Sequence, residues 1–325
     1  PERVPLQRAL GRVLAADVIA PIALPGFDNS AMDGFAVRGL ATPGDGWRLV
    51  GEQFAGVDRG VVLAEGEACR ITTGAPLPAN AEAVLVKENA RLDGDHVHAD
   101  AMPRPGENIR LAGEDARAGD TVLRAGEVLT PARIGLAAAL GLPELEVARR
   151  PTVAVFTTGD ELRPPGQPLA PGELHDSNRA LLQTLLIAEG LEPVAWPILP
   201  DDPAVLAAAL ADAAFSFDLV ITCGGVSAGE KDHLPALLAE RGEVHFWKVR
   251  MKPGMPVLCG RLGEAWILGL PGNPVSVLAT FVTLGRHLLD ALSGRREPRP
   301  RWRARLAAPV SKKHPRREFL RGRLE

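Results

Sequence analysis

Three glycine-rich loops within one short stretch of the chain combine residue types that could bind a phosphate. They cover residues 223–232, 247–254 and 269–276. Glycine lets the backbone approach a ligand closely, and the start of a helix offers unpaired N–H groups to an anion. Lysines and acidic residues lie between the loops. The combination predicts a phosphate-bearing substrate that is bound together with a metal ion.

Three carboxylates are candidates for a metal site, namely Glu161, Asp201 and Asp232. Each lies in a loop that we expect at one edge of a sheet. Mg²⁺ takes one or two carboxylates, several waters and substrate phosphates, so a sparse set suits it. The alternative for each is a helix cap or a solvated loop charge. For Asp202, which precedes Pro203, we prefer the cap.

Two lysines and two serines could contact the anion. Lys248 and Lys252 offer compact positive charges for a phosphate or an oxyanion, although a lysine on an edge strand also prevents aggregation. The hydroxyl groups of Ser227 and Ser276 could accompany backbone N–H groups around a phosphate. Cys223 precedes two glycines, and we interpret it as a buried small side chain and not as a reactive thiol.

Several other chemistries are disfavoured. Neither serine has a histidine at the spacing of a nucleophile and its base, which argues against a serine hydrolase. The seven histidines form no ligand array, which argues against zinc. The sequence contains neither a P-loop nor a dinucleotide-binding glycine fingerprint.

The elements that must position these residues alternate between strand and helix. We expect strands at residues 152–156, 193–198, 218–222 and 244–249, helices at 179–189, after 202, at 233–240 and at 273–291, and a hairpin-like pair at 257–259 and 265–268. This alternation predicts a mainly parallel, doubly wound α/β domain over residues 151–293. Ligands bind such sheets at the carboxyl ends of the strands, where the polar loops fall.

The first 150 residues are rich in glycine and proline and predict a different architecture. We expect a helix over part of residues 6–18, strands at 47–50, 69–72 and 83–86, a hairpin at 118–128 and a helix at 131–140. The prediction is an inserted β domain at 26–113 within an elongated domain made of 1–25 and 114–150. Residues 294–325 are predicted to begin a further β domain.

Composition describes a globular protein of 325 residues with 46% hydrophobic and 24% charged residues. No apolar run approaches the roughly 18 residues that span a bilayer, so we expect no membrane partner. Three scattered cysteines indicate a reducing compartment, hence the cytoplasm. The chain starts at Pro1 without a methionine, and we expect it to be a trimmed piece.

The charge is uneven along the chain. Residues 294–325 hold twelve Lys and Arg against three Asp and Glu, although the whole chain has a net charge of −3. Such a basic tail indicates nucleic acid, a polyanionic small ligand, or simply the solvated faces of short strands. Because only Trp302 and Phe319 could stack on bases, we expect no nucleic-acid partner.

Six motifs in order along the chain resemble molybdopterin molybdenumtransferases, a family that includes the E domain of gephyrin. They are residues 27–36 (FDNSAMDGFA), 70–76 (RITTGAP), 158–162 (TGDEL), 224–227 (GGVS), 252–254 (KPG) and 269–274 (GLPGNP). The resemblance implies a transferase that inserts molybdate into adenylylated molybdopterin and releases AMP with Mg²⁺ present. It also implies four domains, a homodimer, and partners among other proteins of molybdenum cofactor synthesis.

The resemblance also implies roles for individual residues. Asp33 and Thr73 would face the active site of the neighbouring subunit, and Glu161, Asp201 and Asp232 would form the acidic, metal-linked group. Lys248 and Lys252 would bind the oxyanion or phosphates. The pterin phosphate would be held by two loops, comprising Gly224, Gly225, Ser227, Pro271, Gly272, Asn273, Pro274 and Ser276.

Two other functions stay open at this stage. One is a binding or scaffolding module of the gephyrin type, and the other is a nucleotide pyrophosphatase built on the same α/β domain. The family's C-terminal domain is expected to be cut off after Glu325, which would weaken dimerisation or substrate enclosure.

Overall fold

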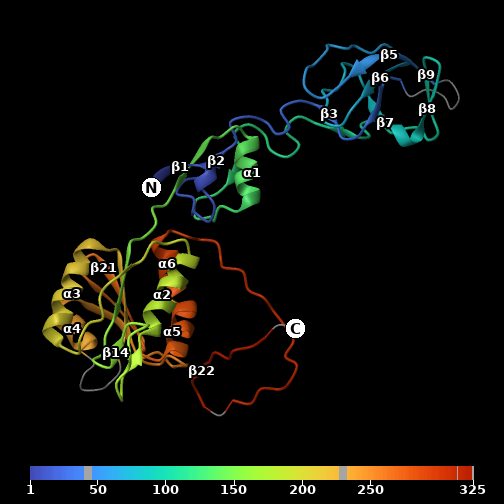
Figure 1. The fold of residues 1–325 in the computed structure, drawn as a ribbon. Helices are drawn as coiled ribbons and strands as arrows, with labels where there is room; N and C mark the ends of the chain where they lie inside the picture. Colours follow the sequence, from blue (N-terminus) through green and yellow to red (C-terminus); the bar gives the residue numbers. More distant parts are fainter. Residues whose placement is uncertain (40–45, 227–232, 313, 324–325) are drawn as a thin grey trace.

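The computed structural model describes residues 1–39, 46–226, 233–312 and 314–323. The chain forms three successive parts (Figure 1). A layered α/β part lies at one end, a small part with β1, β2 and α1 lies in the middle, and a β-rich part with β5 and β6 lies at the other end. Each part has its own hydrophobic core.

The α/β part is built on a sheet of six strands. They are β13 (Val153–Thr157), β16 (Val194–Ala195), β17 (Leu219–Cys223), β18 (Glu243–Trp247), β20 (Leu258–Leu262) and β21 (Ala265–Leu270). Their order across the sheet is β16-β13-β17-β21-β20-β18. The first four are parallel and β20 is antiparallel to both of its neighbours. The predicted mainly parallel α/β sheet is confirmed.

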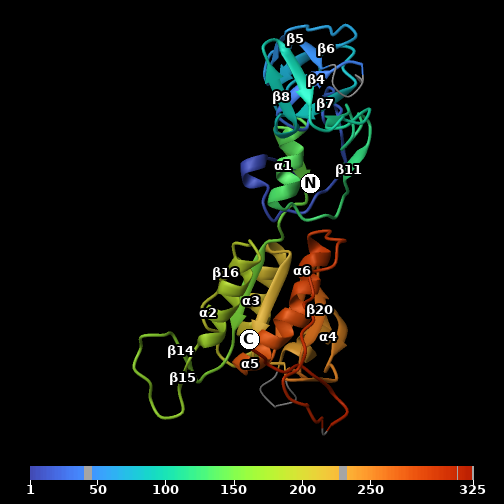
Figure 2. The ribbon, with the colours of Figure 1, turned by 90° about the vertical axis from the view of Figure 1, so that its right-hand side faces the viewer.

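Helices cover both faces of this sheet (Figures 1 and 2). They are α2 (Ser177–Ala188), α3 (Pro203–Ser216), α4 (Leu234–Arg241), α5 (Pro274–Thr280) and α6 (Arg286–Leu292), the last two joined by a π-helical turn at Phe281–Gly285. Successive strand residues point to opposite faces. Val155 therefore packs with Leu182 of α2, whereas Phe156 packs with Leu210 of α3.

The connections of the sheet create a crevice between β13 and β17. From β13 the chain passes through α2 to β16 on one side, and then through α3 to β17 on the other side of β13. At such a reversal of direction the two connections leave the strand ends uncovered, and open α/β sheets bind ligands there. Along the carboxyl edge of the sheet, the topology thus favours the gap between β13 and β17 as the ligand site.

Aspartate side chains cap two of the helices, including the cap predicted at Asp202. Asp176 Oδ1 accepts a hydrogen bond from Arg179 N, and Asp202 Oδ1 accepts two, from Ala204 N and Val205 N. These bonds satisfy N–H groups that have no partner within the helix. Asp202 is therefore explained by helix geometry alone.

One helix, the continuous stretch Pro274–Leu292, is long and apolar enough to cross a bilayer by length and composition. The prediction had considered only unbroken apolar runs. Its residues Val277, Phe281 and Leu289 lie in the core against the sheet. The stretch Pro274–Leu292 thus buries one face against the sheet, as core helices of α/β domains do.

The β-rich part contains a second six-stranded sheet, in the order β7-β4-β6-β5-β9-β8. Its strands are β4 (Gly34–Val37), β5 (Trp47–Gln53), β6 (Glu67–Ile71), β7 (Ala83–Val86), β8 (Ala90–Asp93) and β9 (His96–Ala99), and β3 (Asn29–Ser30) pairs with β10 (Ile109–Arg110) beside it. The strands predicted within residues 47–86 are all present. Trp47 and Val97 are buried together in this part.

The middle part joins segments that are distant in sequence. Strand β1 (Glu2–Pro5) pairs with β12 (Glu144–Val147), and β2 (Val18–Ile19) pairs with β11 (Thr121–Leu123), next to α1 (Pro131–Ala139). The division at residues 25, 113, 150 and 293 stays our proposal. It is supported by the core of this part, which combines residues 4–18 with 123–147.

Two predictions for this part were wrong. The helix expected within residues 6–18 is limited to a 3₁₀ turn at Leu6–Arg8, whose C-cap is Ala9, and the left-handed Gly11 (φ 72°) then turns the chain away from a helical path. The hairpin expected at 118–128 does not form, because Thr121–Leu123 pairs with β2 instead. In both segments the apolar side chains are buried by contacts across the chain, which a local pattern does not encode.

The last part of the chain carries little regular structure. Within residues 294–312 and 314–323, one strand is present, β22 (Arg317–Glu318), and it pairs in parallel with β19 (Met251–Lys252). Arg317 N donates to Arg250 O and Phe319 N donates to Lys252 O. The tail therefore returns to the loop that carries Lys252.

Asp218 fastens the sheet to the preceding segment. Its carboxylate accepts two hydrogen bonds from the Arg149 guanidinium, at 2.8 and 2.9 Å, and two more from Thr152. The bonds from Arg149, followed by those from Thr152, lower the pKa of Asp218 from 3.8 to about 2.

We expect Asp218→Asn to lower the free energy of unfolding at neutral pH by about 2 kcal/mol. A depressed pKa stabilises the fold above the unfolded value of about 3.9, and this stability is lost as the pH falls through about 2. Urea titrations between pH 7 and 3 would therefore show a shallower loss of stability in the variant. Asp212→Asn, at an exposed position of α3, is the matched control. Equal pH slopes for wild type and Asp218→Asn would contradict the assignment.

Candidate functional site

A small cavity of about 180 Å³ lies at the crevice between the ends of β13 and β17. It is lined by Thr158, Gly159, Glu161, Leu162, Asn178, Asp201, Cys223, Gly224, Gly225 and Gly272. These residues come from the loops after β13, β16, β17 and β21 and from the start of α2. The structure thus brings together two predicted carboxylates and two predicted glycine loops.

Glu161 reaches this cavity because of the glycine two residues before it. A Cβ atom on Gly159 would lie 2.6 Å from the Glu161 carboxylate, and the φ angle of Gly159 is 151°. Both facts make a side chain at position 159 unfavourable. The turn is shaped so that the carboxylate folds back over it.

Asp201 lies in the loop after β16. Its backbone N–H donates to Asp160 Oδ1 at 3.2 Å, which fixes this loop against the turn after β13. The described residues contain no group of three or more His, Cys, Asp or Glu side chains arranged for a metal. Two carboxylates on one cavity fit Mg²⁺, which completes its shell with waters and phosphates, better than they fit zinc.

The loop after β17 needs its two glycines for both conformation and space. Gly224 and Gly225 have φ angles of 96° and 67°. A Cβ atom on Gly224 would lie 2.7 Å from Thr158 Oγ1 and 2.8 Å from the Thr158 carbonyl oxygen. The backbone of this loop therefore lies directly against the turn after β13, with its surface open to the cavity.

The loop after β21 leads into α5 and is joined to α2. Asn273 caps α5, since its Oδ1 accepts from Val275 N at 2.9 Å, and Pro274 is the first residue of the helix. Asn178 Nδ2 donates to Gly272 O at 2.6 Å. Pro271 and Ser276 are buried on either side of the exposed Gly272. The starts of two helices are thus held beside the same cavity.

The two predicted lysines lie on neighbouring loops and do not line the cavity. Lys248 follows the edge strand β18, and its Nζ lies 4.1 Å from the centre of the Trp247 ring. Trp247 Nε1 in turn donates to Val226 O. Lys252 Nζ lies 3.1 Å from Glu318 Oε1 in the tail. Both ammonium groups are exposed, and the edge-strand explanation for Lys248 stays open.

Comparison with known proteins gives matches over both halves of the chain. A model of the "MoeA N-terminal region (domain I and II)" matches residues 1–141, and a "Probable molybdopterin binding domain" matches residues 154–291. A relative from Haemophilus influenzae named molybdopterin molybdenumtransferase is 41% identical over 99% of this chain and 80% of its own length. Molybdopterin molybdenumtransferase 2 of Mycobacterium tuberculosis is 43% identical over 100% of this chain and 84% of its own length.

This chain belongs to the molybdopterin molybdenumtransferase family. Its fold agrees with that assignment. The crystal structure of a molybdopterin biosynthesis MoeA protein from Pyrococcus horikoshii superposes with a TM-score of 0.73 at 33% identity, covering 90% of this chain and 75% of that one. The resemblance inferred from the six motifs is therefore confirmed.

Two residues that the family resemblance singles out lie in the β-rich part. Thr73 donates to Asp33 Oδ1 from both its backbone N–H and its hydroxyl, at 2.8 and 2.9 Å. These bonds, the backbone one first, lower the pKa of Asp33. Asp33 directly precedes β4 and Thr73 follows β6, and both strands lie in the β-rich part at the far end of the molecule from the α/β sheet (Figure 2). Within one chain the pair is remote from the cavity.

Two further predicted residues, Ser227 and Asp232, lie outside the residues that the structure describes. Cys223 is 2% exposed, and burial raises the pKa of its thiol, as expected of a buried small side chain. Burial also raises the pKa of Cys69 and of Cys259 to about 11. All three are free thiols.

Thr158 and Asn178 line the cavity but were not among the predicted site residues. Thr158 begins the 158–162 motif, whereas Asn178 lies in none of the six motifs and stands at the capped start of α2. The cap is made by Asp176, which leaves Asn178 free to face the cavity. A buried amide beside a cap residue was the signal that could have identified it.

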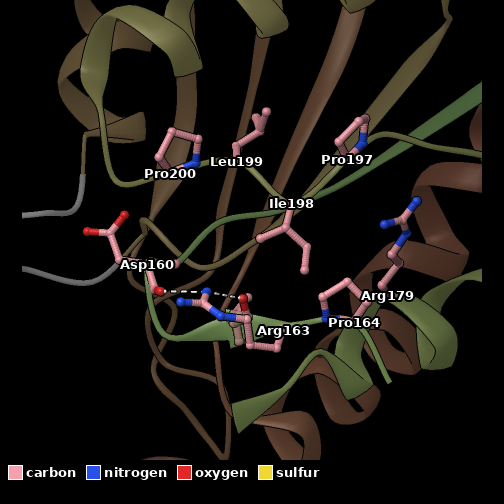
Figure 3. A pocket seen from close by; sticks show the side chains of 10 residues that line it. Asp160, Arg163, Pro164, Arg179, Pro197, Ile198, Leu199 and Pro200 are labelled. Carbon is pink, nitrogen blue, oxygen red and sulfur yellow. Dashed lines mark hydrogen bonds between the residues drawn. The ribbon is translucent and has the colours of Figure 1, made fainter. Parts of the chain in front are cut away.

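A larger cavity of about 580 Å³ shares Gly159 and Leu162 with the first (Figure 3). It is lined by Arg163, Pro164, Arg179 and the segment from Pro197 to Pro200. The Arg163 guanidinium donates to Asp160 O and Leu162 O and pairs with Glu173. The Arg179 guanidinium donates to Ala195 O. Because both arginines are engaged and the cavity contains neither the 224–225 nor the 271–276 loop, we place the chemistry in the smaller cavity.

The ion pair between Lys252 and Glu318 generates a prediction. Lys252 and His314 lower the pKa of Glu318, so this carboxylate is ionised at neutral pH. Its charge partly cancels that of Lys252. We expect Glu318→Gln to bind molybdate about two- to fivefold more tightly, by calorimetric titration, with a difference that shrinks at high ionic strength.

The control is Glu264→Gln, which removes a carboxylate that also pairs with a cation, Arg261, but lies in the hairpin between β20 and β21. Weaker molybdate binding by Glu318→Gln would show that the carboxylate holds Lys252 in place and does not compete for it.

Proposed function

We propose that this chain inserts molybdate into adenylylated molybdopterin and releases AMP. The observation that carries the proposal is the single cavity at the β13–β17 crevice, in which Glu161 and Asp201 face the glycine loop at Gly224 and Gly225. A phosphate anhydride needs backbone donors for its oxygens and a group that neutralises charge as the bond breaks. The glycine loop and the two carboxylates line this cavity, and the names of the relatives supply the substrate class.

The proposed Mg²⁺ would be held by Glu161 and Asp201, together with Asp232 from the loop outside the described residues. When bound, the ion supplies Lewis-acid neutralisation of the pyrophosphate charge. The protein positions the two carboxylates. The turn at Gly159 directs Glu161 toward the cavity, and the bond from Asp201 N to Asp160 fixes the loop that carries Asp201.

The proposed binding of molybdate rests on Lys252 and Lys248. Molybdate is a tetrahedral dianion, which fixed cations bind without a redox step. Lys248 is held over the Trp247 ring, and this ring is joined to Val226 at the start of the glycine loop that reaches Asp232. The proposal gives Gly224, Gly225, Ser227 and the loop from Pro271 to Ser276 the role of holding the pterin phosphate.

We further propose a cytoplasmic homodimer that exchanges its substrate and product with other proteins of molybdenum cofactor synthesis. In such a dimer the Asp33–Thr73 pair of one subunit would complete the cavity of the other. The proposal accounts for two bonded polar residues in a part that lies apart from the cavity of its own chain.

Replacing Glu161 tests the metal-linked cavity. We expect Glu161→Gln to slow the release of AMP from adenylylated molybdopterin on the order of 10²-fold and to raise the Mg²⁺ concentration needed for half-maximal rate. Glu192→Gln is the control, since this exposed glutamate precedes β16 at the opposite edge of the sheet. Unchanged turnover in Glu161→Gln would count against the proposal.

The same assay separates the two alternatives. A scaffolding module would bind the pterin and form no AMP at any Mg²⁺ concentration. A nucleotide pyrophosphatase would release AMP equally fast with and without molybdate.

Mixed dimers test the composite site. We expect Asp33→Ala and Glu161→Gln to be nearly inactive alone, and their co-expressed mixture to recover roughly a quarter of the wild-type rate, because half of the dimers then contain one intact site. Each variant purified on its own, at the same total protein concentration, serves as the baseline. A mixture no more active than its components would rule out a site shared between subunits.

A further inference from the structure

The side chain of Trp247 connects two loops at the carboxyl edge of the α/β sheet. Trp247 is the last residue of the edge strand β18, and its indole Nε1 donates to Val226 O at 2.8 Å. Val226 follows the glycine pair after β17, is 1% exposed and packs in the core with Leu234. This bond to a residue that core packing holds in place fixes the ring, although Trp247 itself is 39% exposed.

The face of this ring carries the ammonium group of the next residue. Lys248 Nζ lies 4.1 Å from the ring centre, well within the roughly 6 Å over which an aromatic face attracts a cation. An exposed lysine otherwise samples many rotamers, and ordering it when an anion binds costs conformational entropy. The ring lowers that cost because it holds the ammonium before the anion arrives.

The backbone of Lys248 adopts a conformation that is uncommon for its residue type. Its φ angle is 65°, in the left-handed region. The other non-glycine residues with a positive φ in the described part of the chain are Asn80 and Asn108, and asparagine tolerates this conformation better than lysine does. Lys248 N donates to Val257 O at 3.0 Å, so the segment before β20 holds the turn in place. Backbone strain at a side chain that could bind a ligand indicates a functional role.

The two lysines of the proposed oxyanion site are held by different kinds of partner. Lys252 Nζ lies 3.1 Å from the Glu318 carboxylate, which offsets part of its charge. No carboxylate of the described residues forms an ion pair with Lys248, whose partner is the Trp247 ring. An aromatic ring attracts a cation through its quadrupole and has no net charge. It therefore positions the ammonium and leaves the whole positive charge available to an anion.

We propose that Trp247 is a positioning residue for the oxyanion site. Its ring holds the Lys248 ammonium beside the start of the loop after β17, and its N–H group fixes the ring to Val226. This rests on the proposed function in so far as that function gives Lys248 an anionic ligand. Trp247 takes no part in bond breaking, and its effect on anion binding passes through Lys248.

A double-mutant cycle tests the proposal, with molybdate titrated calorimetrically into the full chain. We expect Lys248→Ala to weaken molybdate binding roughly tenfold and Trp247→Leu about fivefold. Trp247→Phe should weaken it only about twofold, because it keeps an aromatic face and loses the N–H group. In the Lys248→Ala background, Trp247→Leu should have no further effect, since the two residues contribute to one interaction.

The matched control is Trp266→Leu. Trp266 also faces a cation, since the Arg261 guanidinium lies 5.5 Å from its ring centre, but it stands near the start of β21, at the other edge of the sheet from the loops. We expect this variant to bind molybdate as the wild type does. Should Trp247→Leu fail to fold, Trp247→Phe in the wild-type and Lys248→Ala backgrounds gives the same cycle with a smaller effect.

Equal molybdate affinity of the wild type and either single variant, Trp247→Leu or Lys248→Ala, would overturn the proposal. An equal loss on replacing Trp247 in both backgrounds would also overturn it, because the ring would then act through the fold and not through Lys248. A wild type that releases AMP but binds no molybdate would remove this inference and leave the transferase. Coupled molybdate binding without any AMP release would reject the proposed transferase and leave the positioning role of Trp247 standing.

Discussion

The close approach of two loop backbones at the ends of β13 and β17 is the constraint on which the rest of the site depends. Gly224 lies so near the Thr158 hydroxyl and carbonyl that no side chain fits between them. This contact holds the loops after β13 and β17 against each other. A small cavity remains beyond the ends of the two strands. Once this contact is set, the loops after β16 and β21 need to bring only one or two groups each.

In the α/β part, the strands fix the position of the backbone and the loops carry the polar side chains of the cavity. The central strands β13 and β17 are buried along their whole length, whereas most polar groups of the cavity lie one to four residues beyond a strand end or at the start of a helix. Backbone position is thereby fixed by packing, and side-chain chemistry is left to short turns. Open α/β sheets commonly place their ligand-binding groups in this way. Here Asn178 also joins the start of α2 to the loop before α5.

Much of the α/β part could be predicted from the sequence because its signals are local. The cap at Asp202, the apolar runs of β13 and β17, and the glycine loops each follow from a few neighbouring residues. The middle part was predicted less well, since the apolar residues between Val4 and Val18 pack against residues more than a hundred positions away. The same limit applies to the site: the loops were evident, but Thr158 and Asn178 became candidates only when the structure placed them on one cavity.

The pairing of β22 with β19 means that proteolysis could change the surroundings of Lys252 without unfolding the α/β part. Residues 295–312 form no helix or strand, and the two-residue β22 is the one strand that anchors the described tail residues to the α/β part. A single cut in that extended stretch would leave the six-stranded sheet and its core undisturbed, yet would release the only carboxylate that pairs with Lys252 among the described residues. Limited digestion could thus alter the charge beside the anion loop in a molecule that still looks folded by every spectroscopic measure of secondary structure.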